Sequence, residues 1–138
     1  MDLTVLDAGV IIAILDAGDA HLAGAVEAVR SALDHGDALV LPASAYAEIL
    51  VAPHRRGAEA VATVDAFVDA LPARVEPATR AVAAMAAELR ARHGGQLRLP
   101  DALVVATGVV LGATRIVTTD AGWPQLPVTV GVIRPQVS

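Results

Sequence analysis

The stretch of sequence that decides the fold covers residues 3–16 and reads LTVLDAGVIIAILD. Its first four residues form an apolar run of strand length, and Asp7 ends that run. Residues 11–16 then carry apolar side chains at the spacing of a helix. A short strand followed at once by a helix is the first half of a βαβ unit, from which parallel sheets are built. The opening of the chain therefore predicts an α/β fold.

The same alternation continues to the end of the chain, with prolines and glycines between the segments. Further strands are predicted at residues 38–41, 74–76, 115–118 and 128–133. Further helices are predicted at residues 22–33, 45–52, 58–71, 79–92 and 102–111, and an exposed corner at residues 51–57. The length of 138 residues predicts a single domain, residues 1–138. The predicted architecture is a three-layer α/β/α sandwich around a mostly parallel sheet of four or five strands.

Four carboxylates fall at element boundaries of this arrangement. Asp7 and Asp120 each end a predicted strand. Asp101 stands at a predicted helix start, and Glu48 lies in the helix after the second strand. Because the carboxyl ends of parallel strands share one edge, where open α/β sheets bind ligands, we expect these side chains to lie together. Clustered carboxylates repel one another unless a cation lies among them, and oxygen ligands suit Mg²⁺ or Mn²⁺ better than zinc.

Each acid alone also has a structural interpretation. Asp101, after a proline, is an equally good helix cap, and Asp120 fits a turn. Glu48 resists such an explanation, because an uncompensated carboxylate in an apolar helix costs free energy. The remaining acids considered are expected on solvated faces or in turns; they are Asp16, Asp19, Asp34, Asp37, Asp65 and Asp69.

Composition excludes several classes of protein. The longest weakly polar stretch, residues 102–113, is shorter than the roughly 20 residues of a membrane span, so a soluble protein is expected. The N-terminus has no secretion pattern, which predicts a cytoplasmic location. Zero cysteines and four scattered histidines provide no zinc ligand set and no thiol nucleophile. The net charge of -5 argues against coating nucleic acid by bulk electrostatics.

Four segments in chain order resemble the signature regions of the PIN domain: VLDAG (5–9), PASAYAE (42–48), LPDA (99–102) and IVTTD (116–120). In length, element order and motif order the chain is similar to VapC-type toxins, the ribonuclease halves of toxin–antitoxin pairs. The resemblance implies a metal-dependent endoribonuclease with one or two Mg²⁺ or Mn²⁺ ions. Such an ion offsets the charge of the phosphodiester and activates water as the nucleophile.

The resemblance also assigns roles to individual residues. The positions that match the family's metal-binding and catalytic acids are Asp7, Glu48, Asp101 and Asp120. Thr118 matches the hydroxyl residue that orients the last acid or a bound water. Gly9 departs from the pattern, because many members carry Asn or Ser there.

The expected partners are an RNA substrate, a cognate antitoxin and a second copy of the chain in a homodimer. The early helical segments, residues 11–33 and 45–71, carry more apolar surface than a small sheet covers, which predicts an antitoxin groove and a dimer contact. An antitoxin arginine can then reach the acidic site and displace its metal. Candidate RNA-binding residues ahead of Asp101 are Arg90, Arg92 and Arg98, although charges at a helix end explain them equally well.

Other acidic α/β folds fit less well. A receiver domain uses a lysine near its last strand, and this chain has none. A haloacid-dehalogenase-type phosphatase needs a second aspartate where Gly9 stands. Within the PIN family, an RNA-processing nuclease and a non-catalytic interaction module remain alternatives. Binding alone gives no reason to retain clustered repulsion, which favours an enzyme.

Overall fold

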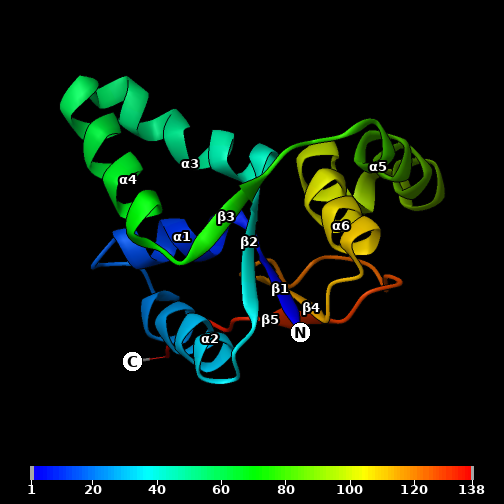
Figure 1. Ribbon diagram of the computed structural model, residues 1–138, viewed down its shortest axis with the longest axis horizontal. Coiled ribbons are helices and arrows are strands. Elements are labelled where there is room, and N and C mark those ends of the chain that lie inside the picture. Colours follow the sequence, from blue (N-terminus) through cyan, green and yellow to red (C-terminus); the bar gives the residue numbers. More distant parts are fainter. Residues whose placement is uncertain (1, 138) are drawn as a thin grey trace.

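The computed structural model describes residues 2–137 and contains a central parallel sheet (Figure 1). Its strands are β1 (Leu3–Leu6), β2 (Ala38–Pro42), β3 (Ala73–Glu76), β4 (Arg115–Thr118) and β5 (Val130–Val132). The strand order is β3-β2-β1-β4-β5, and every neighbouring pair is parallel. The predicted parallel sheet is confirmed, with five strands among the described residues.

Helices lie on both sides of this sheet. They are α1 (Ala8–Leu15), α2 (Leu22–Asp34), α3 (Ala43–Arg56), α4 (Ala58–Ala70), α5 (Arg80–His93), the 3-10 turn η1 (Gly94–Gln96) and α6 (Leu99–Leu111). In Figure 1, α5 and α6 lie on one side of the sheet, and α1 and α2 lie on the other. The three-layer α/β/α prediction is therefore confirmed. None of the helices within residues 2–137 combines the length and apolar character needed to cross a membrane.

The central strands are covered on both faces, so their sequences are almost continuously apolar. Val5, Leu6 and Ile116 are fully buried. Helix α6 comes close to β4 at Gly108, where an added Cβ would lie 2.8 Å from Ile116 Cδ1. The small residues of this helix thus allow close packing on the sheet.

Three of the predicted element boundaries differ from those in the structure. Helix α1 begins three residues earlier than predicted, because Asp7 caps it by accepting the Ala8 N–H at 2.8 Å. Helix α6 begins at Leu99, so Asp101 lies within its first turn. The last strand is shorter than predicted and pairs over Val130–Val132 only.

The predicted corner at residues 51–57 is shorter than expected: the two helices meet at Gly57 alone, because α3 continues to Arg56 through Pro53. Proline removes a helical hydrogen bond. Here the Pro53 side chain is buried, and its carbonyl accepts the Gly57 N–H at 3.0 Å. Gly57, with φ +123, makes the turn into α4, in a conformation that favours glycine.

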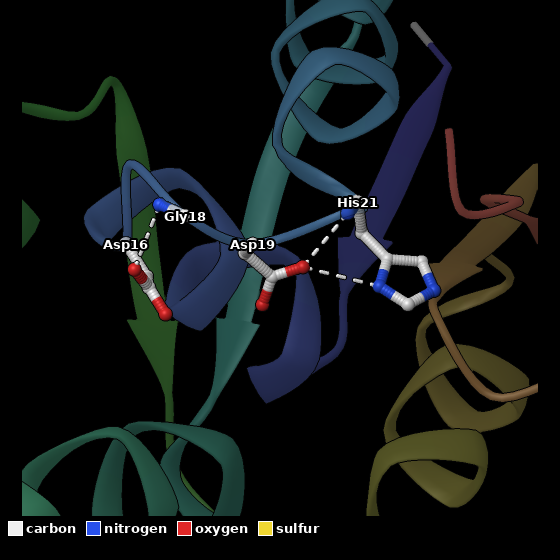
Figure 2. A network of polar contacts seen from close by, with 4 residues as sticks. All are labelled: Asp16, Gly18, Asp19 and His21. Carbon is white, nitrogen blue, oxygen red and sulfur yellow. Dashed lines mark hydrogen bonds and ion pairs between the residues drawn. The ribbon is translucent and has the colours of Figure 1, made fainter. Parts of the chain in front are cut away.

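The turn between α1 and α2 is held by two aspartates (Figure 2). Asp16 Oδ1 accepts the Gly18 N–H at 3.0 Å, and Asp19 Oδ1 accepts the His21 N–H at 2.7 Å. The backbone bond to His21 is the main reason that the pKa of Asp19 is lowered. Both aspartates therefore have the turn positions expected from the sequence.

The expectation that Asp37 is solvated is wrong. Its side chain is buried just before β2, where Oδ2 accepts the Thr4 hydroxyl at 2.8 Å and lies 3.8 Å from Arg115 Nη1. Because Thr4 and Arg115 belong to β1 and β4, Asp37 ties three adjacent strands together at their amino-terminal edge.

Candidate active site

The opposite, carboxyl-terminal edge of the sheet carries the first and last of the four acids. Asp7 directly follows β1, and Asp120 follows β4, which pairs with β1. The Asp7 N–H donates to the Val117 carbonyl at 3.0 Å, which extends the β1–β4 ladder by one residue. Parallel pairing thus brings two acids that are far apart in the sequence to one edge.

Thr118 links these two acids. Its hydroxyl donates to Asp7 Oδ2 at 2.7 Å, and its Oγ1 accepts the Asp120 N–H at 3.1 Å. Asp7 is 8% exposed, whereas the Asp120 side chain is exposed and accepts the Gly122 N–H at 2.8 Å. The resulting edge has a buried, fixed carboxylate beside an accessible one.

The other two acids come from α3 and α6, which pack against each other. Glu48 lies in the second turn of α3, the helix that begins directly after β2. Helix α6 runs back to the start of β4, so its first turn, with Asp101, lies at the carboxyl-terminal edge. The side chain of Asp101 is half-buried, and that of Glu48 is exposed.

Electrostatic coupling joins all four acids. Burial is the main cause that raises the pKa of Asp7, with a further contribution from the charge of Asp120. Although the Glu48 side chain is largely exposed, partial burial of its carboxyl group is the main cause that raises its pKa, and the charges of Asp7 and Asp101 raise it further. The pKa of Asp101 rises through burial and then through the charges of Asp7 and Asp120. The charges of these acids therefore disfavour one another's ionisation, and their role as one site stays a prediction.

The three candidate RNA-binding arginines have different surroundings. Arg98, at the N-cap of α6, is close enough to Glu48 and Asp101 to oppose the rise in their pKa values. Arg90 donates instead to the carbonyls of Gly94 and Leu97, both at 3.0 Å. Arg92 pairs with Glu88 on the exposed face of α5 at 3.4 Å. Of the three, only Arg98 acts on the acidic cluster.

Gly9 and Trp123 complete the surroundings of the site. An added Cβ on Gly9 would lie 2.3 Å from Thr119 Oγ1, so the threonine occupies the space of a larger side chain at position 9. Trp123 is half-buried, and its indole N–H helps to lower the pKa of Asp101 without forming a hydrogen bond of regular geometry. From the sequence, Trp123 fits core packing or stacking on an exposed base, and nothing local reveals its proximity to Asp101.

The four acids offer only oxygen donors, a set that suits Mg²⁺ or Mn²⁺. Within residues 2–137, no three histidine, aspartate or glutamate side chains converge into a formed metal-binding group. Glu48 and Asp120 are both exposed, so their carboxylates are accessible from solvent.

A groove of about 690 Å³ lies between α1, α3 and α4. Glu48 lies at this groove as well as in the acidic cluster. Ile12 and Leu15, 43% and 39% exposed, contribute apolar surface to it. The rest of its apolar lining comes from Ala17, Ile49, Ala52, Pro53, Ala60 and Val64.

Solved structures with the same fold were found by structural comparison. DNA-bound VapBC from Salmonella typhimurium matches with a TM-score of 0.69 and 16% identity, covering 95% of this chain and 98% of that chain. VapBC2 from Rickettsia felis, bound to a promoter DNA fragment, matches with a TM-score of 0.71 and 11% identity, covering 94% and 97%. VapC20 from Mycobacterium tuberculosis, described as a sarcin-ricin loop cleaving toxin, matches with a TM-score of 0.65 and 22% identity, covering 82% and 86%.

The sequence comparisons give one clear family. No curated protein matches the sequence. The family model described as the PIN domain matches residues 4–128, which include all four acids and Thr118. The chain therefore belongs to the PIN domain family.

Proposed function

We propose that this protein is a metal-dependent endoribonuclease toxin that a cognate antitoxin inhibits. The observation that carries the proposal is the coupling among the four acids, whose charges disfavour one another's ionisation at one edge of the sheet. A divalent cation offsets such repulsion, whereas an interaction module has no use for it. Membership of the PIN family and the likeness to toxin–antitoxin proteins support the same function.

The residues that would hold one or two Mg²⁺ or Mn²⁺ ions are Asp7, Glu48, Asp101 and Asp120. When bound, such an ion offsets phosphate charge and lowers the pKa of a water. Thr118 fixes the orientation of Asp7 through Oδ2, and the bond from Ala8 fixes Oδ1. The exposed Glu48 and Asp120 leave the site accessible to a phosphodiester.

Arg98 supplies positive charge beside the acids. A guanidinium binds phosphate oxygens through paired hydrogen bonds. We therefore assign phosphate contact to Arg98, and no direct contact to Arg90, whose donor already holds the loop before α6. Of the three candidate RNA-binding arginines expected from the sequence, we therefore retain only Arg98 as a direct contact.

The proposed inhibitor is an antitoxin segment that lies in the groove between α1, α3 and α4. The apolar lining fits a short amphipathic helix, and Glu48 would place a basic residue of that segment beside the acids. The net charge of -5 favours such a basic partner. We also propose that the protein forms a homodimer and acts in the cytoplasm, where its RNA substrate is found.

Incubation with single-stranded RNA tests the proposed reaction. With Mg²⁺ or Mn²⁺ we expect products with a 5′-phosphate and a 3′-hydroxyl, because water rather than the 2′-hydroxyl attacks. Excess EDTA should stop cleavage. Cleavage that continues in EDTA, or 2′,3′-cyclic phosphate ends, would contradict the mechanism.

Co-expression with the product of a neighbouring antitoxin gene tests the inhibitory partner. The complex should lack nuclease activity. Ile12→Asp, which places a charge in the groove, should weaken binding of the antitoxin. Ala23→Asp, at an exposed position of α2 outside the groove, is the matched control. A complex that still cleaves RNA would contradict the inhibitory role. A protein that remains monomeric even at high concentration would contradict the homodimer.

A further inference from the structure

Trp123 carries a polar group whose role the proposed reaction leaves unexplained. Its indole nitrogen is buried and has no regular hydrogen bond to any described residue. A buried donor without a partner destabilises the fold, because it gives up its hydrogen bonds to water. An aliphatic side chain could fill the same space without that cost, so the N–H group at this position needs a reason.

The local structure holds the indole beside Asp101. Trp123 follows a turn in which Asp120 Oδ1 accepts the Gly122 N–H at 2.8 Å. Burial raises the pKa of Asp101, and the Trp123 N–H is one of the groups that oppose this rise. The donor is therefore near the carboxylate but lacks the geometry of a completed hydrogen bond.

The chemistry of an indole suits a carboxylate that also binds a cation. Asp101 has two oxygens, and a bound cation can leave one of them free. An indole N–H is a neutral donor with no acceptor capacity. It can thus orient the free oxygen without adding positive charge near the ion, in contrast to the neighbouring Arg98. Partners of this kind commonly change metal affinity by a factor of about 10–100.

We propose that Trp123 is a positioning residue, whose indole N–H completes a hydrogen bond to Asp101 when that carboxylate turns toward a bound cation. This inference rests on the proposed metal site. Trp123 acts through Asp101 and touches neither the cation nor the RNA.

The chain contains one tryptophan, so replacing tryptophan throughout the protein changes this position alone. Two replacements remove the donor: Trp123→Phe, and the sulfur isostere β-(benzothien-3-yl)alanine, which keeps the bicyclic shape. Mn²⁺ binding is measured by calorimetry for both proteins and for the wild type. We expect about tenfold weaker binding in each, with the isostere retaining the wild-type apo melting temperature.

Ultraviolet resonance Raman spectra of the wild type provide a second measurement, since one indole band reports hydrogen bonding of the N–H. Added Mg²⁺ should shift this band toward a stronger hydrogen bond, and Asp101→Ala should abolish the shift. Unchanged Mn²⁺ affinity in the isostere, or a band that Mg²⁺ does not move, would overturn the role of Trp123 even if RNA cleavage is normal. A wild type that binds no Mn²⁺ would overturn the proposed metal site itself.

Discussion

The Thr118 hydroxyl donates a hydrogen bond of 2.7 Å to Asp7 Oδ2, joining two residues that are 111 positions apart in the sequence. This bond opposes the burial that raises the pKa of Asp7. The hydroxyl oxygen of Thr118 also accepts the backbone N–H of Asp120. Thr118 therefore connects the side chain of the first acid with the backbone of the last.

Replacing Thr118 with valine tests this connection, because valine keeps the shape and removes the hydroxyl. Asp7 Oδ2 and the Asp120 N–H would both lose a partner. We expect the free energy of unfolding to fall by about 1–3 kcal/mol, measured by chemical denaturation in EDTA. Thr118→Ser, which keeps the hydroxyl, should lose much less. Equal stability of the valine and serine variants would show that the hydroxyl has no stabilising role.

The raised pKa of Asp7 predicts a specific pH dependence of stability in the absence of metal. Burial is its main cause, so the folded protein binds this proton more tightly than the unfolded chain does. The resulting destabilisation is present above the folded pKa and disappears as the pH falls through the folded pKa toward the ordinary value of 3.8.

Asp7→Asn removes this titration and serves as the comparison. In EDTA, the variant should have its greatest stability advantage over wild type at neutral pH, and the advantage should shrink on acidification. Thermal melts of both proteins across that range measure the difference. A difference that grows on acidification would mean that the sign of the pKa shift is opposite.

The arginines on either side of η1 predict different effects on RNA binding. Arg98→Ala should weaken binding of a single-stranded RNA, because the variant loses positive charge beside Asp101 and Glu48. Arg92→Ala is the control of equal charge change, and it affects a residue paired with Glu88 on an exposed helix face. Fluorescence anisotropy in Ca²⁺ measures binding without relying on the activating ions. Equal losses in the two variants would indicate a general charge effect.

Hydrophobic spacing was sufficient to predict the element order and the parallel sheet, because β1, β2 and β4 are short apolar runs separated by helical patterns. The position of Asp7 at a strand end could be predicted for the same reason. Helix ends were less predictable. The capping bond from Ala8 to Asp7 is local but has no counterpart in the hydrophobic spacing, and the burial of Pro53 depends on packing that the local pattern does not reveal.

The burial of Asp37 and the proximity of Trp123 to Asp101 could not be predicted, because each depends on residues distant in the sequence. Asp37 is held by Thr4 and Arg115 from two other strands. A polar residue within an apolar strand, as Thr4 is, was the available sequence signal. Trp123 meets α6 only after β4 and the following turn are in place.

We propose that the four acids bind a cation rather than stabilise the fold. Asp101→Asn keeps the size of the side chain while removing its charge, and it relieves repulsion with Asp7 and Asp120. The most direct measurement compares this variant with wild type in an RNA cleavage assay with Mn²⁺ and in a thermal melt in EDTA. We predict no cleavage, with an apo melting temperature equal to or above that of wild type. Full cleavage would show that the reaction does not need the Asp101 carboxylate, and a melting temperature well below wild type would show that this carboxylate stabilises the fold.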